Sequence, residues 1–293
     1  MGGGSWTRDS FAVYTSSTKG CSVDSLESKS YSAQEFYRKR VISDAMNPYK
    51  VTRECRDSEE HPHTFPVILA LDVTGSMGDA AVRVAQKLNQ IMTDIYSNNS
   101  VEDIEFCVMG IGDIAYDNAP IQISQFESDV RIAEQMDEIY FESGGGGNSY
   151  ESYTAAWYMG VNHCDLDCWK RGKKGVIITL GDEFPNPHLP KRISEITGDN
   201  LQADVETTDL IEEAKKKYFL YHISIDDRST CYKYYKEKDV DSAWRKLIGD
   251  NYKVCNLNSL AGTIVNIISE CNSNESMLFG EETEVHSPSE VSW

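Results

Sequence analysis

The sequence predicts an α/β fold, a Rossmann-like doubly wound sheet of six mostly parallel strands with helices on both faces. Three observations support this prediction. Short apolar runs of strand length alternate along the chain with segments in which apolar residues recur at helical spacing. Several of these runs are nearly continuous, as in strands that are covered on both faces. A hydrophobic content of 40% in 293 residues is enough to fill such a core.

The expected elements follow in order along the chain. Residues 67–71 form an entirely apolar strand, and residues 79–95 form an amphipathic helix after it. Residues 104–111 form a second buried strand, and residues 121–126 alternate between apolar and polar side chains, the pattern of a half-buried edge strand. The remaining expected strands are 176–180, 218–225 and 252–255, and the remaining expected helices of this part are 129–141, 150–161, 191–196, 207–217, 241–248 and 260–271.

Composition divides the chain into three parts. Residues 1–64 are polar and low in aliphatic side chains, so we expect an arm that is largely irregular or wrapped on the main domain. Its one expected helix begins at a capping box formed by Ser32 and Glu35. Residues 65–271 form the expected main domain. Residues 272–293 are acidic and Ser-rich, and we expect a disordered tail there.

The charge balance restricts the partners. Lysine and arginine number 28 against 47 acidic residues, for a formal net charge of −19, which disfavours binding to nucleic acid or to anionic membranes. No apolar run approaches the roughly 18 residues that cross a bilayer, and the N-terminus lacks a basic segment followed by an apolar one. Eight cysteines without such a signal indicate reduced thiols. We therefore expect a cytoplasmic protein.

The first strand leads into a turn that carries candidate metal ligands. Asp72, Thr74 and Ser76 alternate with other residues, and the glycines beside them allow the backbone to approach closely. Mg²⁺ prefers oxygen ligands at roughly 2.1 Å and usually keeps several waters, so it needs few protein ligands. The alternative is an ordinary helix N-cap. The metal interpretation is favoured because a second apolar strand is also followed by an aspartate, in the pair Gly181-Asp182.

These residues resemble a known family. The Asp-x-Thr-x-Ser turn after an apolar strand is similar to the metal-ion-dependent adhesion site of von Willebrand factor A (vWA) domains. The resemblance covers about residues 65–271 and implies an antiparallel edge strand. It also implies two further loops at the metal: one is Gly-rich and offers Asn148 or Ser149 where the family usually has Thr, and the other carries Asp182. Which of Asn148 and Ser149 faces the metal is left open.

The leading functional hypothesis is a Mg²⁺-dependent protein-binding module, with Mn²⁺ or Ca²⁺ as alternative ions. Asp72 and Asp182 would partly neutralise the cation, Thr74 and Ser76 would add neutral oxygens, and a Glu or Asp of a protein partner would occupy the remaining position. The resemblance to stand-alone vWA proteins of bacteria and their viruses implies a MoxR-type AAA+ ATPase as the partner.

Two other functions are weighed against it. A metal-dependent hydrolase or phosphatase would use Glu151 or Glu183 as a base. The motif disfavours this alternative, because the turn reads Asp-x-Thr where a haloacid-dehalogenase-type phosphatase would have Asp-x-Asp. The chain also has no Gly-Lys-Ser/Thr phosphate-binding loop. The other alternative is a structural subunit with a vacant metal site. We therefore expect no catalytic residues.

Overall fold

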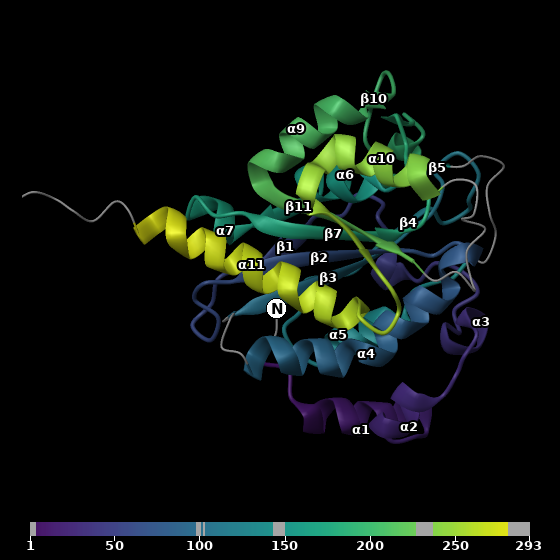
Figure 1. Ribbon diagram of the computed structural model, residues 1–293, viewed down its shortest axis with the longest axis vertical. Coiled ribbons are helices and arrows are strands. Elements are labelled where there is room, and N and C mark those ends of the chain that lie inside the picture. Colours follow the sequence, from purple (N-terminus) through teal and green to yellow (C-terminus); the bar gives the residue numbers. More distant parts are fainter. Residues whose placement is uncertain (1–3, 98–100, 102, 143–149, 227–236, 281–293) are drawn as a thin grey trace, which may run out of the picture.

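A six-stranded sheet forms the centre of the molecule (Figure 1). The computed structural model describes residues 4–97, 101, 103–142, 150–226 and 237–280. The strand order is β12-β11-β7-β2-β3-β4, and all neighbours are parallel except β3 and β4. The six strands are β2 (Phe65–Asp72), β3 (Ile104–Ile111), β4 (Ile121–Ile123), β7 (Gly175–Gly181), β11 (Tyr218–Ile225) and β12 (Tyr252–Cys255). This mixed α/β arrangement confirms the predicted mostly parallel sheet with one antiparallel edge strand.

Strand β2 lies inside the sheet, and all eight of its residues are buried. Because side chains alternate along a strand, Val67 and Leu69 enter one core cluster while Ile68 and Ala70 enter the other. Helices lie on both sides of the sheet in Figure 1. The first cluster packs against α4 (Gly78–Ser97), α5 (Arg131–Asp137) and α11 (Leu260–Gly280), and the second against α6 (Thr154–Asn162), α9 (Thr207–Lys217) and α10 (Glu237–Ile248).

The N-terminal arm is more helical than the sequence predicted. The capping box of Ser32 and Glu35 is present, but α3 (Ala33–Phe36) is only four residues long. Two helices that we did not expect, α1 (Arg8–Lys19) and α2 (Val23–Ser28), lie outside α4 in Figure 1. Phe11 of α1 and Leu26 of α2 are buried, at 2% and 3% exposure, whereas Val13 is exposed, so a low aliphatic content did not prevent docking.

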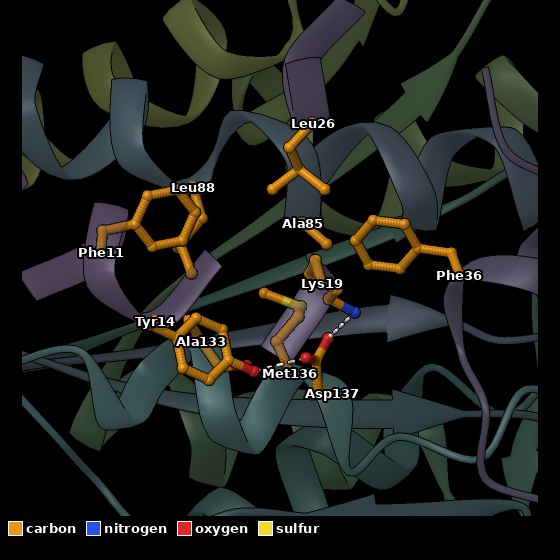
Figure 2. A pocket seen from close by; sticks show the side chains of 10 residues that line it. All are labelled: Phe11, Tyr14, Lys19, Leu26, Phe36, Ala85, Leu88, Ala133, Met136 and Asp137. Atoms are coloured by element: carbon orange, nitrogen blue, oxygen red, sulfur yellow. Dashed lines mark hydrogen bonds and ion pairs between the residues drawn. The ribbon is translucent and has the colours of Figure 1, made fainter. Parts of the chain in front are cut away.

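The arm packs closely on the main domain. Figure 2 shows the small cavity that remains between arm residues and the helices α4 and α5. Its volume is about 10 Å³, roughly the space of one water. Beside it the Lys19 Nζ lies 2.6 Å from the Asp137 Oδ1, and the Tyr14 hydroxyl donates a hydrogen bond to the same carboxylate. The arm is therefore attached by both apolar and charged contacts.

Several boundaries differ from the predicted ones. Helix α6 begins at Thr154 rather than near residue 150, and α11 continues to Gly280, so residues 272–280 are helical instead of belonging to a tail. Residues 281–293 lie outside the described residues. None of the described helices is long and apolar enough to cross a membrane. The remaining short elements are η1 (Asp44–Met46), β1 (Arg53–Cys55), η2 (Gly75–Met77), β5 (Tyr150–Glu151), β6 (Cys164–Leu166), α7 (Asp167–Lys170), β8 (Phe184–Pro185), β9 (His188–Leu189), α8 (Ile193–Thr197), β10 (Val205–Glu206) and η4 (Gly249–Asn251).

Candidate metal centre

The first and third predicted loops meet at the carboxyl ends of β2 and β7. Leu71 and Leu180 are partners in the parallel ladder, so the residues that follow them leave the sheet at the same edge. The Ser76 Oγ donates a hydrogen bond of 3.0 Å to the Asp182 Oδ1. Two segments that are 106 residues apart in sequence are thereby in contact.

The turn after β2 holds Asp72 firmly. The Asp72 Oδ1 accepts hydrogen bonds from the Thr74 backbone N–H at 2.9 Å and from the Thr74 Oγ1 at 2.5 Å. Asp72 is 1% exposed and Asp182 is 7% exposed, whereas Ser76 lies at the surface. Two carboxylates thus lie at the bottom of the candidate site, and one hydroxyl opens toward solvent.

Tyr153 links the two loops, and the sequence did not point to it. Its hydroxyl donates a 2.8 Å hydrogen bond to the Asp72 Oδ2 and accepts bonds from the backbone N–H groups of Asp182 at 3.2 Å and Glu183 at 3.3 Å. A Cβ on Gly181 would lie only 1.9 Å from this hydroxyl, so only glycine fits there. Burial, together with Asp72 and Asp182 nearby, raises the pKa of Tyr153 well above its usual value, which keeps the hydroxyl protonated.

The electrostatics of the site favour a cation. Burial and the neighbouring Asp182 raise the pKa of Asp72 to about 7, although hydrogen bonds from Thr74 and Tyr153 act in the opposite direction. Burial, Asp72 and further acidic neighbours raise the pKa of Glu151 to about 10. Glu151 is 6% exposed, and its Oε2 has no hydrogen-bond partner among the described residues. A divalent ion would relieve the repulsion between these carboxylates.

The donor set suits a hard cation that keeps part of its water shell. Among the described residues, no group of three or more His, Cys, Asp and Glu side chains is arranged to hold a metal ion. The candidate set instead combines two carboxylates, Asp72 and Asp182, with the hydroxyls of Thr74 and Ser76. All four donors are oxygens, and Mg²⁺ usually requires only one or two protein carboxylates. The residues present therefore fit Mg²⁺ better than Zn²⁺, which prefers nitrogen and sulfur.

The second predicted loop is the Gly-rich segment before β5. Asn148 and Ser149, the candidate ligands from the Gly-rich segment, lie outside the described residues. The chain is described again from Tyr150, where β5 pairs in parallel with β8 directly after Glu183. The segment that follows the Gly-rich loop thus returns to the third loop.

Comparisons with known proteins bear on the fold. No protein-family model matches the chain, and no curated protein matches its sequence. Two solved structures of the pilus adhesin SpaC from Lactobacillus rhamnosus GG are similar at 14% identity: an open conformation with a TM-score of 0.50 over 77% of this chain, and a second form with 0.51 over 74%. A mussel byssus protein, proximal thread matrix protein 1, gives 0.43 at 10% identity over 77% of this chain and 47% of its own. This chain spans 31% of the adhesin, and the similarity extends to the α/β fold.

Proposed function

We propose that this chain is a vWA-type module, with a Rossmann-like doubly wound sheet, that binds a protein partner through Mg²⁺. The ion would be held by Asp72, Thr74, Ser76 and Asp182. The observation that carries the proposal is the 3.0 Å hydrogen bond between Ser76 and Asp182. It joins two loops whose sequence patterns each predicted metal ligands independently. Asn148 or Ser149 would add a further oxygen.

The chain's own residues would orient the ligands. Tyr153 fixes Asp72 through Oδ2 and holds the backbone at Asp182, so the two carboxylates are positioned before an ion binds. When bound, the ion supplies an electrophilic position for one more oxygen ligand. A carboxylate is the strongest oxygen ligand that a protein partner offers, and we therefore propose that a Glu or Asp of the partner completes the site.

The cellular partner is a second part of the proposal. The family resemblance suggests a MoxR-type AAA+ ATPase in the cytoplasm. Metal and partner would then bind cooperatively, because the partner's carboxylate would be a ligand of the ion and the ion would provide the position that this carboxylate occupies. Co-purification from the native host with and without EDTA tests this part, and recovery of the same partner in equal amount in EDTA would contradict it.

Calorimetric titration with MgCl₂ tests the ion site directly. We expect the wild type to bind Mg²⁺ and Asp182→Asn to bind it more than about ten-fold more weakly, since a charged ligand is lost. Asp209→Asn is the matched control, because Asp209 is an exposed acid in the first turn of α9. Equal Mg²⁺ affinity in Asp182→Asn and wild type would reject the proposed site. A structural subunit would bind no ion, and a hydrolase would in addition cleave phosphate esters.

A further inference from the structure

A polar cleft lies directly beside the candidate metal ligands. Its volume is about 170 Å³, more than ten times the roughly 10–15 Å³ that one water occupies. We call it the arm cleft, because residues of the N-terminal arm form one of its walls. It is lined by Ser32, Ala33, Gln34, Gly75, Ser76, Gly78, Asp79 and Phe141.

The wall formed by the arm is held in place by buried contacts. A Cβ on Gly78 would lie 3.2 Å from the Ala33 Cβ and 3.5 Å from the Phe141 Cζ, so α3 sits tightly on the start of α4. The Tyr37 ring stacks on Phe141 at 5.9 Å, and its hydroxyl donates a 2.7 Å hydrogen bond to the Ala81 carbonyl. The cleft is therefore part of the packed structure.

The chemistry of the cleft is polar and acidic. Ser76, which contacts Asp182, opens into it, and so do the exposed side chains of Ser32 and Gln34. Asp79 is exposed in the first turn of α4, and no hydrogen bond or ion pair joins its carboxylate to another described residue. The cleft thus offers one unpaired negative charge and several hydrogen-bonding groups to whatever lies next to the metal site.

We propose that the arm cleft receives a Lys or Arg side chain of the partner, adjacent in the partner's chain to the acidic residue at the metal. This inference rests on the proposed function and specifies its partner: a segment in which an acidic residue has a basic neighbour. Asp79 is a specificity-determining residue, and the ammonium or guanidinium group pairs with its carboxylate. The arm therefore contributes to recognition as well as to packing.

A displayed library of random peptides with a fixed central Glu tests this inference. Peptides are selected on the wild type in MgCl₂ and eluted with EDTA, and we expect Lys or Arg to be enriched close to the Glu. We expect Asp79→Asn to bind a selected basic peptide about two- to five-fold more weakly, as for a solvent-accessible ion pair. Gln34→Trp, which fills the cleft from an exposed position, should weaken the same peptide while Mg²⁺ affinity is retained.

The matched control is Asp24→Asn, which removes an exposed acid from the first turn of α2. It should leave peptide affinity unchanged. If no peptide elutes with EDTA, metal-dependent binding fails and the inference fails with it. If peptides elute with EDTA but lack a basic neighbour, or bind Asp79→Asn as tightly as the wild type, the assignment of the arm cleft is wrong and the metal site stands.

Discussion

Tyr153 shows how one side chain can organise the candidate site. Its hydroxyl satisfies one carboxylate oxygen and two backbone N–H groups in a region with little access to water. Buried polar groups that lose their partner are costly, so any replacement that lacks the hydroxyl should destabilise the fold. Its role is that of a positioning residue, because it acts on the candidate ligand Asp72 and is not itself one.

For this single residue we predict the effects of the substitution Tyr153→Phe. Loss of the hydroxyl should lower the free energy of unfolding by about 1–3 kcal/mol and weaken Mg²⁺ binding by about ten-fold or more. Urea denaturation and calorimetric titration measure the two effects. Tyr218→Phe is the control, because Tyr218 is equally buried and its hydroxyl donates to the Gly160 carbonyl at 2.8 Å. It should lose stability but keep its Mg²⁺ affinity. Unchanged Mg²⁺ affinity in Tyr153→Phe would contradict the positioning role.

Two glycines show that the effect of a glycine-to-alanine substitution on stability depends on the element in which the glycine lies. Gly181 is the last residue of β7, where the chain passes closest to the Tyr153 ring. Gly262 lies in α11, is exposed, and has no atom within 4 Å of the position of a Cβ. The same substitution should therefore have opposite effects, because one glycine prevents a clash and the other only weakens a helix.

For the two elements β7 and α11 we predict opposite stability changes on alanine substitution. Gly262→Ala should raise the free energy of unfolding by about 0.5–1 kcal/mol, since alanine has the higher helix propensity. Gly181→Ala should lower it by about 1–3 kcal/mol or more, since the Tyr153 ring must move. Thermal and urea denaturation of both variants measure the changes. Stability equal to the wild type in Gly181→Ala would mean that the ring is loosely held and that the site is less rigid than its contacts imply.

The whole molecule carries a formal net charge of −19, and its candidate site gathers buried acids. Both features make cations stabilising, but in different ways. Any salt screens the general repulsion between charges at the surface, whereas an ion that binds only the native state stabilises it through mass action. The two contributions are separable, because only the second depends on the ligands.

For the whole molecule we predict that MgCl₂ raises the melting temperature more than NaCl of equal ionic strength. At a concentration of one hundred times the dissociation constant, binding should add about 2.7 kcal/mol to the stability of the native state. Asp182→Asn should keep the response to NaCl and lose the additional response to MgCl₂. Identical melting curves of the wild type in the two salts would show that Mg²⁺ acts by screening alone.

Local patterns determined much of this protein. The apolar runs placed all six strands of the sheet, and the polar turns after β2 and β7 selected Asp72 and Asp182. The strand predictions were confirmed because hydrophobic periodicity is a property of short segments. Asp72 and Asp182 lie at one edge because parallel strands bring their carboxyl ends together, and their binding of a metal ion stays a prediction. The proposal of a site at that edge therefore needs no knowledge of the packing.

Tertiary packing decided the side-chain contacts that no local pattern indicates. Nothing local to Tyr153 indicates a hydrogen bond to a carboxylate 81 residues away, and nothing in a polar N-terminal arm indicates that α3 forms a wall beside Ser76. The docking of Phe11 and Leu26 against α4 depends likewise on a surface that only the folded domain supplies. The sequence alone therefore determined the order of the strands along the chain and the chemistry at their ends. Only the tertiary structure decided which side chains are in contact, because residues far apart in the sequence come together only when the whole core is packed.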